Sequence, residues 1–329
     1  MEDIALILST TLMYSTPLIF TALGGVLSEN SGIVNIGLEG MMTIGAFAGA
    51  AAGYLVGNPW IAFLIGGLAG GLFALIHAIA TVSFNADHTI SGVAINLLAP
   101  GVALFTSKIL FDGATMTPTI SMEDKMPRPL NGLFPDGGIL NTIFNTYATV
   151  FIAFILVAVV WYILYKTKLG LRIRAVGEHP GAADTLGINV ARVRYIAVIA
   201  SGILAGFGGA SMSLAIVSSF RPTLISGQGY IAMAAVIFGK WRPQGAMGAC
   251  LLFGFSTALA VFFGNPELPF SINENLLSMI PYVITLIVLV LFIKTSKAPT
   301  ALGTSIKRER DKNDSICYHF FYFNIFNII

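Results

Sequence analysis

The chain has 329 residues, of which 56% are hydrophobic and only 10% are charged. Soluble domains carry about 25% charged residues, so this composition excludes a water-soluble enzyme and a disordered chain. The net charge of +2 says little as a total, and no nucleic-acid partner is expected. The composition predicts a polytopic, all-α membrane protein.

Nine stretches approach or reach the roughly 20 apolar residues that a helix needs to cross a bilayer. They are residues 4–26, 37–56, 59–80, 90–110, 142–165, 195–219, 223–239, 243–263 and 276–293. The stretch 223–239 is short, and 27–40 is interrupted by polar residues between positions 28 and 35. Either segment is a candidate half-helix, which a membrane tolerates when it is buried in protein. We therefore expect about eight to ten transmembrane segments.

Positive charge is concentrated in loop 166–194, in the turn 240–242 and after residue 293, which together hold 14 of the 18 Lys and Arg residues. Counting crossings puts these segments on one side, which the positive-inside rule makes the cytoplasm. The loops 111–141 and 264–275 then lie outside, and the C-terminus is cytoplasmic. The N-terminus is outside if all nine segments span, and inside if one is re-entrant.

Two connecting loops are large enough to have a role of their own. Loop 111–141 contains four prolines, and it is either an ordinary connector or a docking surface for an external partner. Loop 166–194 has a centre of small residues between Gly177 and Gly187. Pro180 can start a short helix there and Gly187 can stop it. Such a helix lets another protein approach closely, but an ordinary loop fits the residues equally well.

Several polar or flexible side chains interrupt the apolar spans, where they usually face the interior of a bundle. They are Asn35, Glu39, Met42, Asn96 and Gln228. Asn35 and Glu39 share a helix face, with Met42 one turn further. The Glu39 carboxylate could bind a substrate hydroxyl or amine, carry a proton, or accept bonds from nearby backbone. Hydrogen bonding between helices is the alternative role for each of these residues.

Histidines and an aspartate mark the inner ends of two predicted spans. His77 ends one span, and Asp87 and His88 lie in a short inner loop. We expect all three at the membrane surface.

No catalytic or phosphate-binding motif is visible. The glycine runs 66–71 and 202–209 lack phosphate-loop spacing and lie inside apolar spans, so we predict that they are helix-packing faces. The two cysteines and four histidines show no metal-binding spacing. We expect no enzyme activity, no metal and no cofactor in this chain, and any ATP would be bound by another subunit.

Four segments together resemble the permease subunits of ABC importers that serve branched-chain amino acids, ribose and nucleosides. They are GIVNIGLEGMMTIGAFAGA (32–50), TISGVAINLLAPGVALF (89–105), GLRIRAVGEHPGAADTLGINVARVRYIAVIASGILAGFGGA (170–210) and GQGYIAMAAVIFGKWRPQGAMGACLLFG (227–254). The likeness covers residues 1–303. The run SENSGIVNIGLEG, the asparagines at 35 and 96, and the FGKW run are most similar to nucleoside-uptake permeases.

The resemblance implies a type II importer bundle in the bacterial inner membrane that works by alternating access. Residues 177–187 would be the coupling helix that docks on an ATP-binding cassette subunit. The positions that match the family there are Gly177, Glu178, Pro180, Ala183 and Gly187. The external loop would contact a substrate-binding lipoprotein, and a second permease subunit, identical or homologous, would complete the path. Asn35, Glu39, Met42, Asn96 and Gln228 become candidates for lining the route of a nucleoside.

Other functions fit the same residues. The architecture could import a sugar or a branched-chain amino acid instead. A secondary transporter driven by an ion gradient would use Glu39 as its proton or cation site. A receptor-like or structural membrane protein is a third class.

The C-terminus departs from the family pattern. We expect a membrane domain over residues 1–298 and a tail over 299–329 that is atypical after Gly303. There TSIKRERDKNDS precedes ICYHFFYFNIFNII, which is too short to span a membrane and is rich in aromatic residues. An altered reading frame is favoured over a membrane-surface anchor. Deleting 304–329 is therefore expected to leave transport intact.

Overall fold

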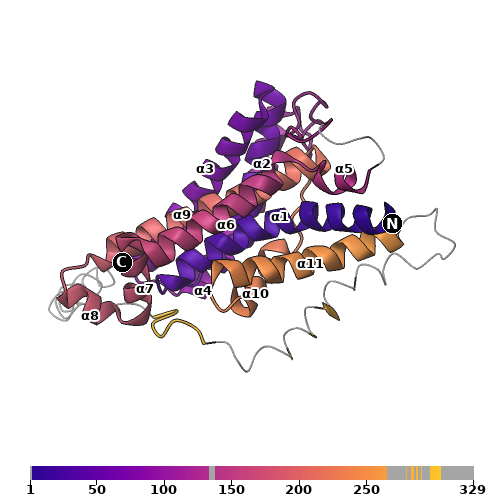
Figure 1. Cartoon of the computed structure of the whole chain (residues 1–329). Helices are drawn as coiled ribbons and strands as arrows, with labels where there is room; N and C mark the ends of the chain where they lie inside the picture. Colours follow the sequence, from indigo (N-terminus) through magenta and orange to yellow (C-terminus); the bar gives the residue numbers. More distant parts are fainter. Residues whose placement is uncertain are drawn as a thin grey trace.

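The computed structural model describes residues 2–132, 138–264 and 297–304, together with five single positions between 279 and 290. Within these residues the regular structure is helical, and the helices pack as an elongated bundle (Figure 1). The predicted span 276–293 lies almost wholly outside the described residues. So does the aromatic tail beyond Thr304.

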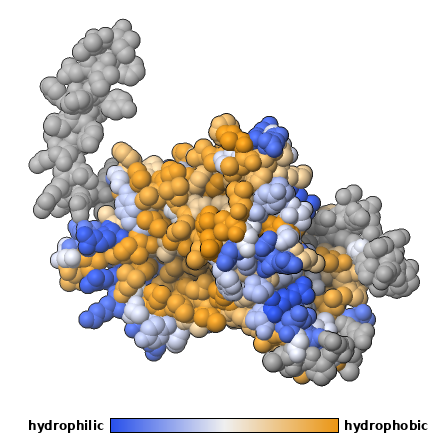
Figure 2. Space-filling view, turned by 90° about the horizontal axis from the view of Figure 1, so that it is seen from above, coloured by the Kyte–Doolittle hydropathy of each residue, from blue (hydrophilic) through white to orange (hydrophobic). Residues whose placement is uncertain are grey.

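Six helices in the described part are long and apolar enough to cross a membrane. They are α1 (Glu2–Asn30), α3 (Pro59–Ala78, continued by η1, Ile79–Ser83), α4 (His88–Leu110), α6 (Ala148–Lys166), α9 (Val190–Ser211, continued by η2, Met212–Val217) and α11 (Pro243–Phe263). Each coincides with one of the nine predicted stretches, which confirms the polytopic helical class. Hydrophobic residues form most of the molecular face in Figure 2.

Two further helices start inside the bundle. Helix α2 (Leu38–Val56) is rich in Gly and Ala, and 14 of its 19 residues are buried. Helix α10 (Gln228–Phe238) has 11 residues, so it rises only about 16 Å and is too short for a hydrocarbon core about 30 Å thick. The half-helix expected within 223–239 is therefore present.

The break after the first span begins later than predicted. Helix α1 continues through Ser28 and ends at Asn30, and the irregular segment covers residues 31–37. The Asn30 side-chain amide donates to the Val26 carbonyl oxygen at 2.7 Å, one helical turn back. This bond satisfies the polar side chain of Asn30 within the last turn of α1. The sequence pattern alone does not show that the helix extends this far.

Glycine faces bring α2, α3 and α9 into backbone contact. A Cβ atom added at Gly45 of α2 would lie 2.5 Å from Gly206 Cα of α9, and one at Gly70 of α3 would lie 2.3 Å from the Gly202 carbonyl oxygen. Neither approach is possible for a residue with a side chain. The glycine runs are thus packing faces, as predicted, and they bury α2 at the centre of the bundle.

The predicted cytoplasmic segments meet at one end of the molecule, here termed the α8 end (Figure 1). It contains α7 (Lys168–Glu178) and α8 (Pro180–Thr185). The turn after α10 joins it, because Asn30 donates to the Trp241 carbonyl oxygen at 3.0 Å and Trp241 Nε1 donates to the buried Glu29 carboxylate. The N-terminus and the short helix α5 (Ile139–Phe144) lie at the opposite end.

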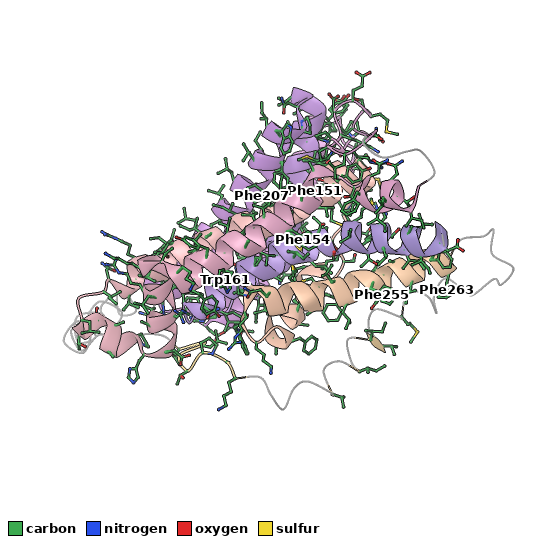
Figure 3. All side chains as sticks on the ribbon, in the orientation of Figure 1. Phe151, Phe154, Trp161, Phe207, Phe255 and Phe263 are labelled. Atoms are coloured by element: carbon green, nitrogen blue, oxygen red, sulfur yellow. The ribbon has the colours of Figure 1, made fainter. Side chains whose placement is uncertain are left out.

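The predicted external loop is ordered where it is described. The Thr117 amide donates to the Phe220 carbonyl oxygen at 3.1 Å, and the Ile120 amide to the Ser218 carbonyl oxygen at 2.8 Å. These bonds tie residues 111–132 to the loop that follows η2. The exposed outer faces of the helices carry apolar and aromatic side chains, including Phe255 and Phe263 along α11 (Figure 3).

Candidate functional site

The irregular segment 31–37 has its backbone satisfied by side chains from other helices. The Val34 amide donates to His88 Nδ1 at 3.4 Å, and the Val34 carbonyl oxygen lies 3.3 Å from His77 Nε2. The Ser31 carbonyl oxygen accepts from Arg194 Nε at 3.2 Å. Unwound backbone at membrane depth is stable only when it is satisfied in this way.

These contacts add burial to a sequence-based expectation. His77 and His88, which were expected at the membrane surface, are 0% and 5% exposed within the protein. The Ser91 hydroxyl lies 2.8 Å from His77 Nδ1. Because a carbonyl only accepts, His77 Nε2 carries the proton, and Nδ1 accepts from Ser91.

Asp87, in contrast, stays at the surface and caps α4. Its carboxylate accepts from the Thr89 amide at 2.8 Å and the Ile90 amide at 2.9 Å. The bond from Ile90 is the main reason that the pKa of Asp87 lies below its usual value.

Asn96 of α4 closes the start of α2. Its Oδ1 accepts from the Gly40 amide at 2.8 Å, and its Nδ2 donates to the Ile36 carbonyl oxygen at 2.9 Å. The same Nδ2 also donates to the Tyr230 hydroxyl of α10 at 2.9 Å. One amide side chain therefore links the break, α2 and α10.

Glu39 of α2 closes the start of α10. Its two carboxylate oxygens accept from the amides of Gly227 and Gly229, each at 2.6 Å. A carboxylate at a helix N-terminus also interacts favourably with the helix dipole. The starts of α2 and α10 are thus linked directly by Glu39 and indirectly by Asn96.

This meeting point lies within the helix bundle and has an accessible side. Asn96 is eight residues beyond the first residue of α4, or about 12 Å along that helix. Asn96, Glu39 and Gln228 are half-buried, whereas Tyr230 is 48% exposed. The arrangement offers an aromatic ring, amide groups and capped helix ends to a polar, uncharged molecule.

Asn35 and Met42 occupy the interior behind this surface. Both are 0% exposed. Asn35 Nδ2 donates to Ser201 Oγ at 3.0 Å, which ties the break to α9. Met42 packs near Gly208 of the same helix. The structure therefore brings Glu39, Asn96 and Gln228 to one accessible surface and places Asn35 and Met42 behind it.

The predicted coupling segment forms two helices separated at His179. Pro180 is the first residue of α8, and Gly187, with φ of +78°, follows its end. Ala183 and Gly177 are buried, and a Cβ at Gly177 would lie 2.1 Å from the Asn30 carbonyl oxygen. Glu178 faces this chain, since its Oε2 accepts from Thr300 Oγ1 at 2.7 Å. The prominent exposed side chain is Leu186, at 81%.

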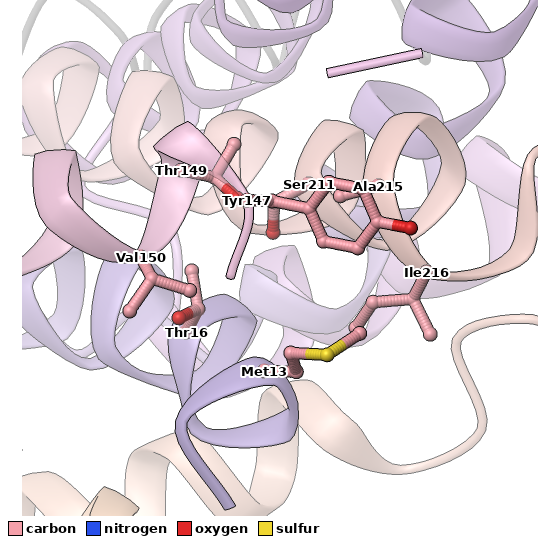
Figure 4. Close-up of a pocket in the computed structure, with 8 residues that line it drawn as sticks. All are labelled: Met13, Thr16, Tyr147, Thr149, Val150, Ser211, Ala215 and Ile216. Carbon is pink, nitrogen blue, oxygen red and sulfur yellow. The ribbon is translucent and has the colours of Figure 1, made fainter. Parts of the chain in front are cut away.

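A separate pocket lies between α1, α6 and α9 (Figure 4). Its lining is Met13, Thr16, Tyr147, Thr149, Val150, Ser211, Ala215 and Ile216. Thr16 and Ser211 already donate their hydroxyl protons to the carbonyl oxygens of Leu12 and Gly208. None of the residues that the sequence singled out lines this pocket.

Residues 7–289 match the family described as the permease component of the branched-chain amino acid transport system. The chain belongs to this permease family. It is accordingly a multi-pass membrane protein and a permease subunit of ABC transporter type. No solved structure matches the chain.

Individual relatives extend over nearly the whole chain. The guanosine ABC transporter permease protein NupQ of Bacillus subtilis is 46% identical over 92% of this chain and 96% of its own length. The nucleoside ABC transporter permease protein NupC of Lactococcus lactis is 43% identical over 92% and 97%. TsgC13 of Haloferax volcanii, a permease whose name assigns glucose provisionally, is 35% identical over 93% and 98%.

Sequence reasoning missed several residues of this permease. No local pattern singles out Tyr230 or Arg194, and Thr300 lies in the stretch that was predicted as a tail (299–329). Each contacts a partner that is far away in the chain. Asn96 and Tyr230, for example, are 134 positions apart.

Proposed function

We propose that this permease translocates nucleosides in an ATP-driven importer by alternating access. The carrying observation is its similarity over nearly the full length to two permeases whose names specify guanosine and nucleosides. The site adds a physical reason, because the starts of α2 and the half-helix α10 lie next to each other inside the bundle. A movement of either start would open or close the surface formed by Asn96, Glu39 and Tyr230.

The chemistry of this surface favours a neutral, aromatic cargo. The carboxylate oxygens of Glu39 already accept from backbone amides at the start of α10. Asn96 Oδ1 likewise accepts from the Gly40 amide at the start of α2. Neither helix end is therefore free to bind the carboxylate of an amino acid. The exposed Tyr230 ring provides a stacking face for a base. Half-buried Gln228 can exchange hydrogen bonds with a base or a ribose.

The partners follow from the same proposal. An ATP-binding cassette subunit would contact α8, where Leu186, Asp184 and Gly181 are exposed. A substrate-binding lipoprotein would contact the ordered loop at the opposite end. The α8 end is then cytoplasmic, in agreement with its basic residues. A second permease subunit would cover the exposed apolar face of α4, which includes Ile90, Leu97 and Phe105.

Transport by the reconstituted complex tests this proposal. The permease, its ATPase, its binding protein and any second permease are placed in liposomes that are loaded with ATP or left empty. We expect uptake of labelled guanosine and uridine with ATP only, in preference to glucose and leucine. Dissipating proton and sodium gradients with ionophores should change nothing.

The outcomes separate the alternatives. Uptake that persists without ATP and stops with ionophores contradicts the ATP-driven mechanism and supports an ion-coupled transporter. ATP-dependent uptake that prefers glucose or leucine keeps the importer but overturns the nucleoside cargo. A complex that moves none of the four solutes and does not hydrolyse ATP in response to them contradicts both parts.

A further inference from the structure

Residues 299–304, here termed the strap, connect two segments of the α8 end. The Ala301 amide donates to the Gly177 carbonyl oxygen at 2.9 Å, at the end of α7. The Gly303 amide donates to the Gly32 carbonyl oxygen at 3.0 Å, in the break before α2. In Figure 1 this described segment, drawn in yellow, lies beside α7.

Glu178 fixes the strap to α7 from the other side. Its Oε2 accepts from the Thr300 hydroxyl at 2.7 Å and from the Thr300 amide at 3.3 Å. The Glu178 carboxylate therefore binds a residue of its own chain. The family position that suggested contact with an ATPase thus positions the strap in this structure.

Arg194 joins the strap to the break. It lies in the second turn of α9 and is only 2% exposed. Its Nε donates to the Ser31 carbonyl oxygen and its Nη1 to the Thr304 carbonyl oxygen, both at 3.2 Å. A Cβ at Gly32 would lie 3.0 Å from Nη2, so the guanidinium packs directly on the break.

The burial of the Arg194 guanidinium is energetically unfavourable, which indicates that this side chain serves to position the segments it contacts. A buried cation needs strong partners to offset the loss of water. Here the contacts found for the guanidinium are neutral carbonyl oxygens, and Nη2 has no hydrogen-bond partner among the described residues. The planar guanidinium does, however, hold two separate chain segments at fixed geometry, which a lysine cannot do.

We propose that Arg194 and the strap form a joint that transmits movement of α7 and α8 to the 31–37 break. The break leads directly into α2, whose start is held by Asn96 and whose Glu39 holds α10. Displacing the joint would therefore shift the contacts that hold the surface formed by Asn96, Glu39 and Tyr230. Coupling of this kind travels through packed and hydrogen-bonded segments with more than one arrangement. Arg194, Glu178 and Thr300 are then positioning residues.

The test uses the complete reconstituted transporter and rests on the proposed ATP-driven function. Thr300→Val removes the hydroxyl donor to Glu178, and Thr300→Ser keeps it. Arg194→Lys keeps the charge but loses the two-point geometry. Three quantities are measured for each variant: complex assembly with thermal stability, basal ATP hydrolysis, and uptake per ATP hydrolysed.

We expect Thr300→Val and Arg194→Lys to assemble and hydrolyse ATP normally while uptake per ATP falls at least about fivefold, the lower range of site-to-site coupling. Thr300→Ser should keep uptake per ATP near the wild-type value, because it retains the hydroxyl donor. Unchanged uptake per ATP in both variants overturns the proposal. So does a parallel loss of stability, hydrolysis and uptake, because that pattern describes a structural anchor. A wild-type complex without ATP-driven uptake would instead refute the proposed function itself.

Discussion

At the scale of single residues, Asn96 and Glu39 accept hydrogen bonds from backbone amides at the starts of α2 and α10. Hydrogen bonds to a charged group are worth about 1.5–3 kcal/mol each, and a buried group left unsatisfied costs about 1–3 kcal/mol. Glu39 makes two such bonds to the start of α10. Its carboxylate is therefore engaged within the chain, which argues against its use as a freely exchanging proton or cation site.

Asn96→Leu tests the importance of this network for transport. Leucine has a similar volume but cannot bond to Gly40, Ile36 or Tyr230, so the starts of α2 and α10 lose their shared link. We expect uptake to fall at least about tenfold, equivalent to roughly 1.4 kcal/mol, because more than one buried group is left without a partner. Association with the ATPase, measured by co-purification, should stay unchanged because the hydrogen bonds of Asn96 go to the break, α2 and α10 and not to α8.

Tyr230→Phe is the matched control. It removes one hydroxyl acceptor but keeps the exposed ring and both bonds from Asn96 to the start of α2. Uptake should fall less than in Asn96→Leu. If Asn96→Leu transports at the wild-type rate, Asn96 is a packing residue only.

At the scale of elements, the start, the packing and the end of α8 are set by three small or rigid residues. Pro180 starts the helix, Ala183 anchors it inward, and Gly187 ends it in a left-handed conformation. Residues other than glycine pay about 1–2 kcal/mol in that region of backbone space. A Cβ at Gly187 would meet nothing within 4 Å, so a larger side chain would point into open space.

Gly187→Arg is therefore expected to fold and insert normally but to obstruct whatever docks on α8. Uptake should drop at least about fivefold with insertion unchanged, as measured by transport and by membrane fractionation. Gly187→Ala carries the same backbone strain without the bulk and should keep most of the activity. Full-rate transport by Gly187→Arg would remove α8 from the coupling surface.

The sequence predicted most of these elements correctly, since the cues are local. The short apolar run of α10, the glycine faces of α2, α3 and α9, and the Pro180–Gly187 frame each depend on neighbouring residues in the chain. The start of the break after α1 was misplaced because Ser28 and Asn30 looked like helix-ending residues. Asn30 instead bonds within its own helix and to Trp241.

At the scale of the whole molecule, the bundle has two chemically different ends. The basic loops, the turn before α11 and the strap assemble at the α8 end, and the ordered loop 111–132 covers the opposite end. The strap makes residues up to Thr304 part of the folded unit, since the Thr304 carbonyl oxygen accepts from Arg194. A truncation that tests the tail should therefore begin beyond this residue.

Deleting residues 307–329 is expected to leave ATP-driven uptake within about twofold of wild type, since the strap and its contacts are retained and we expect the stability to change by less than about 0.5 kcal/mol. Retaining Ser305 and Ile306 leaves two residues after Thr304 before the new C-terminus. Deleting 300–329 removes the strap and should abolish coupled uptake. Loss of uptake in the shorter deletion would show that the aromatic tail has a role of its own.

The sequence by itself determined that this is a polytopic membrane protein with a short half-helix, glycine packing faces and a short helix framed by Pro180 and Gly187. These features arise from hydrophobicity, spacing and turn residues, which act over a few positions, whereas the permease family was indicated by the resemblance of four longer segments. Tertiary structure alone decided that Glu39 caps a helix 188 residues away, that His77 is buried, and that Glu178 and Arg194 hold the strap. The physical reason is that a polar side chain in a membrane takes the partner that folding brings within hydrogen-bonding distance, and no local pattern names that partner.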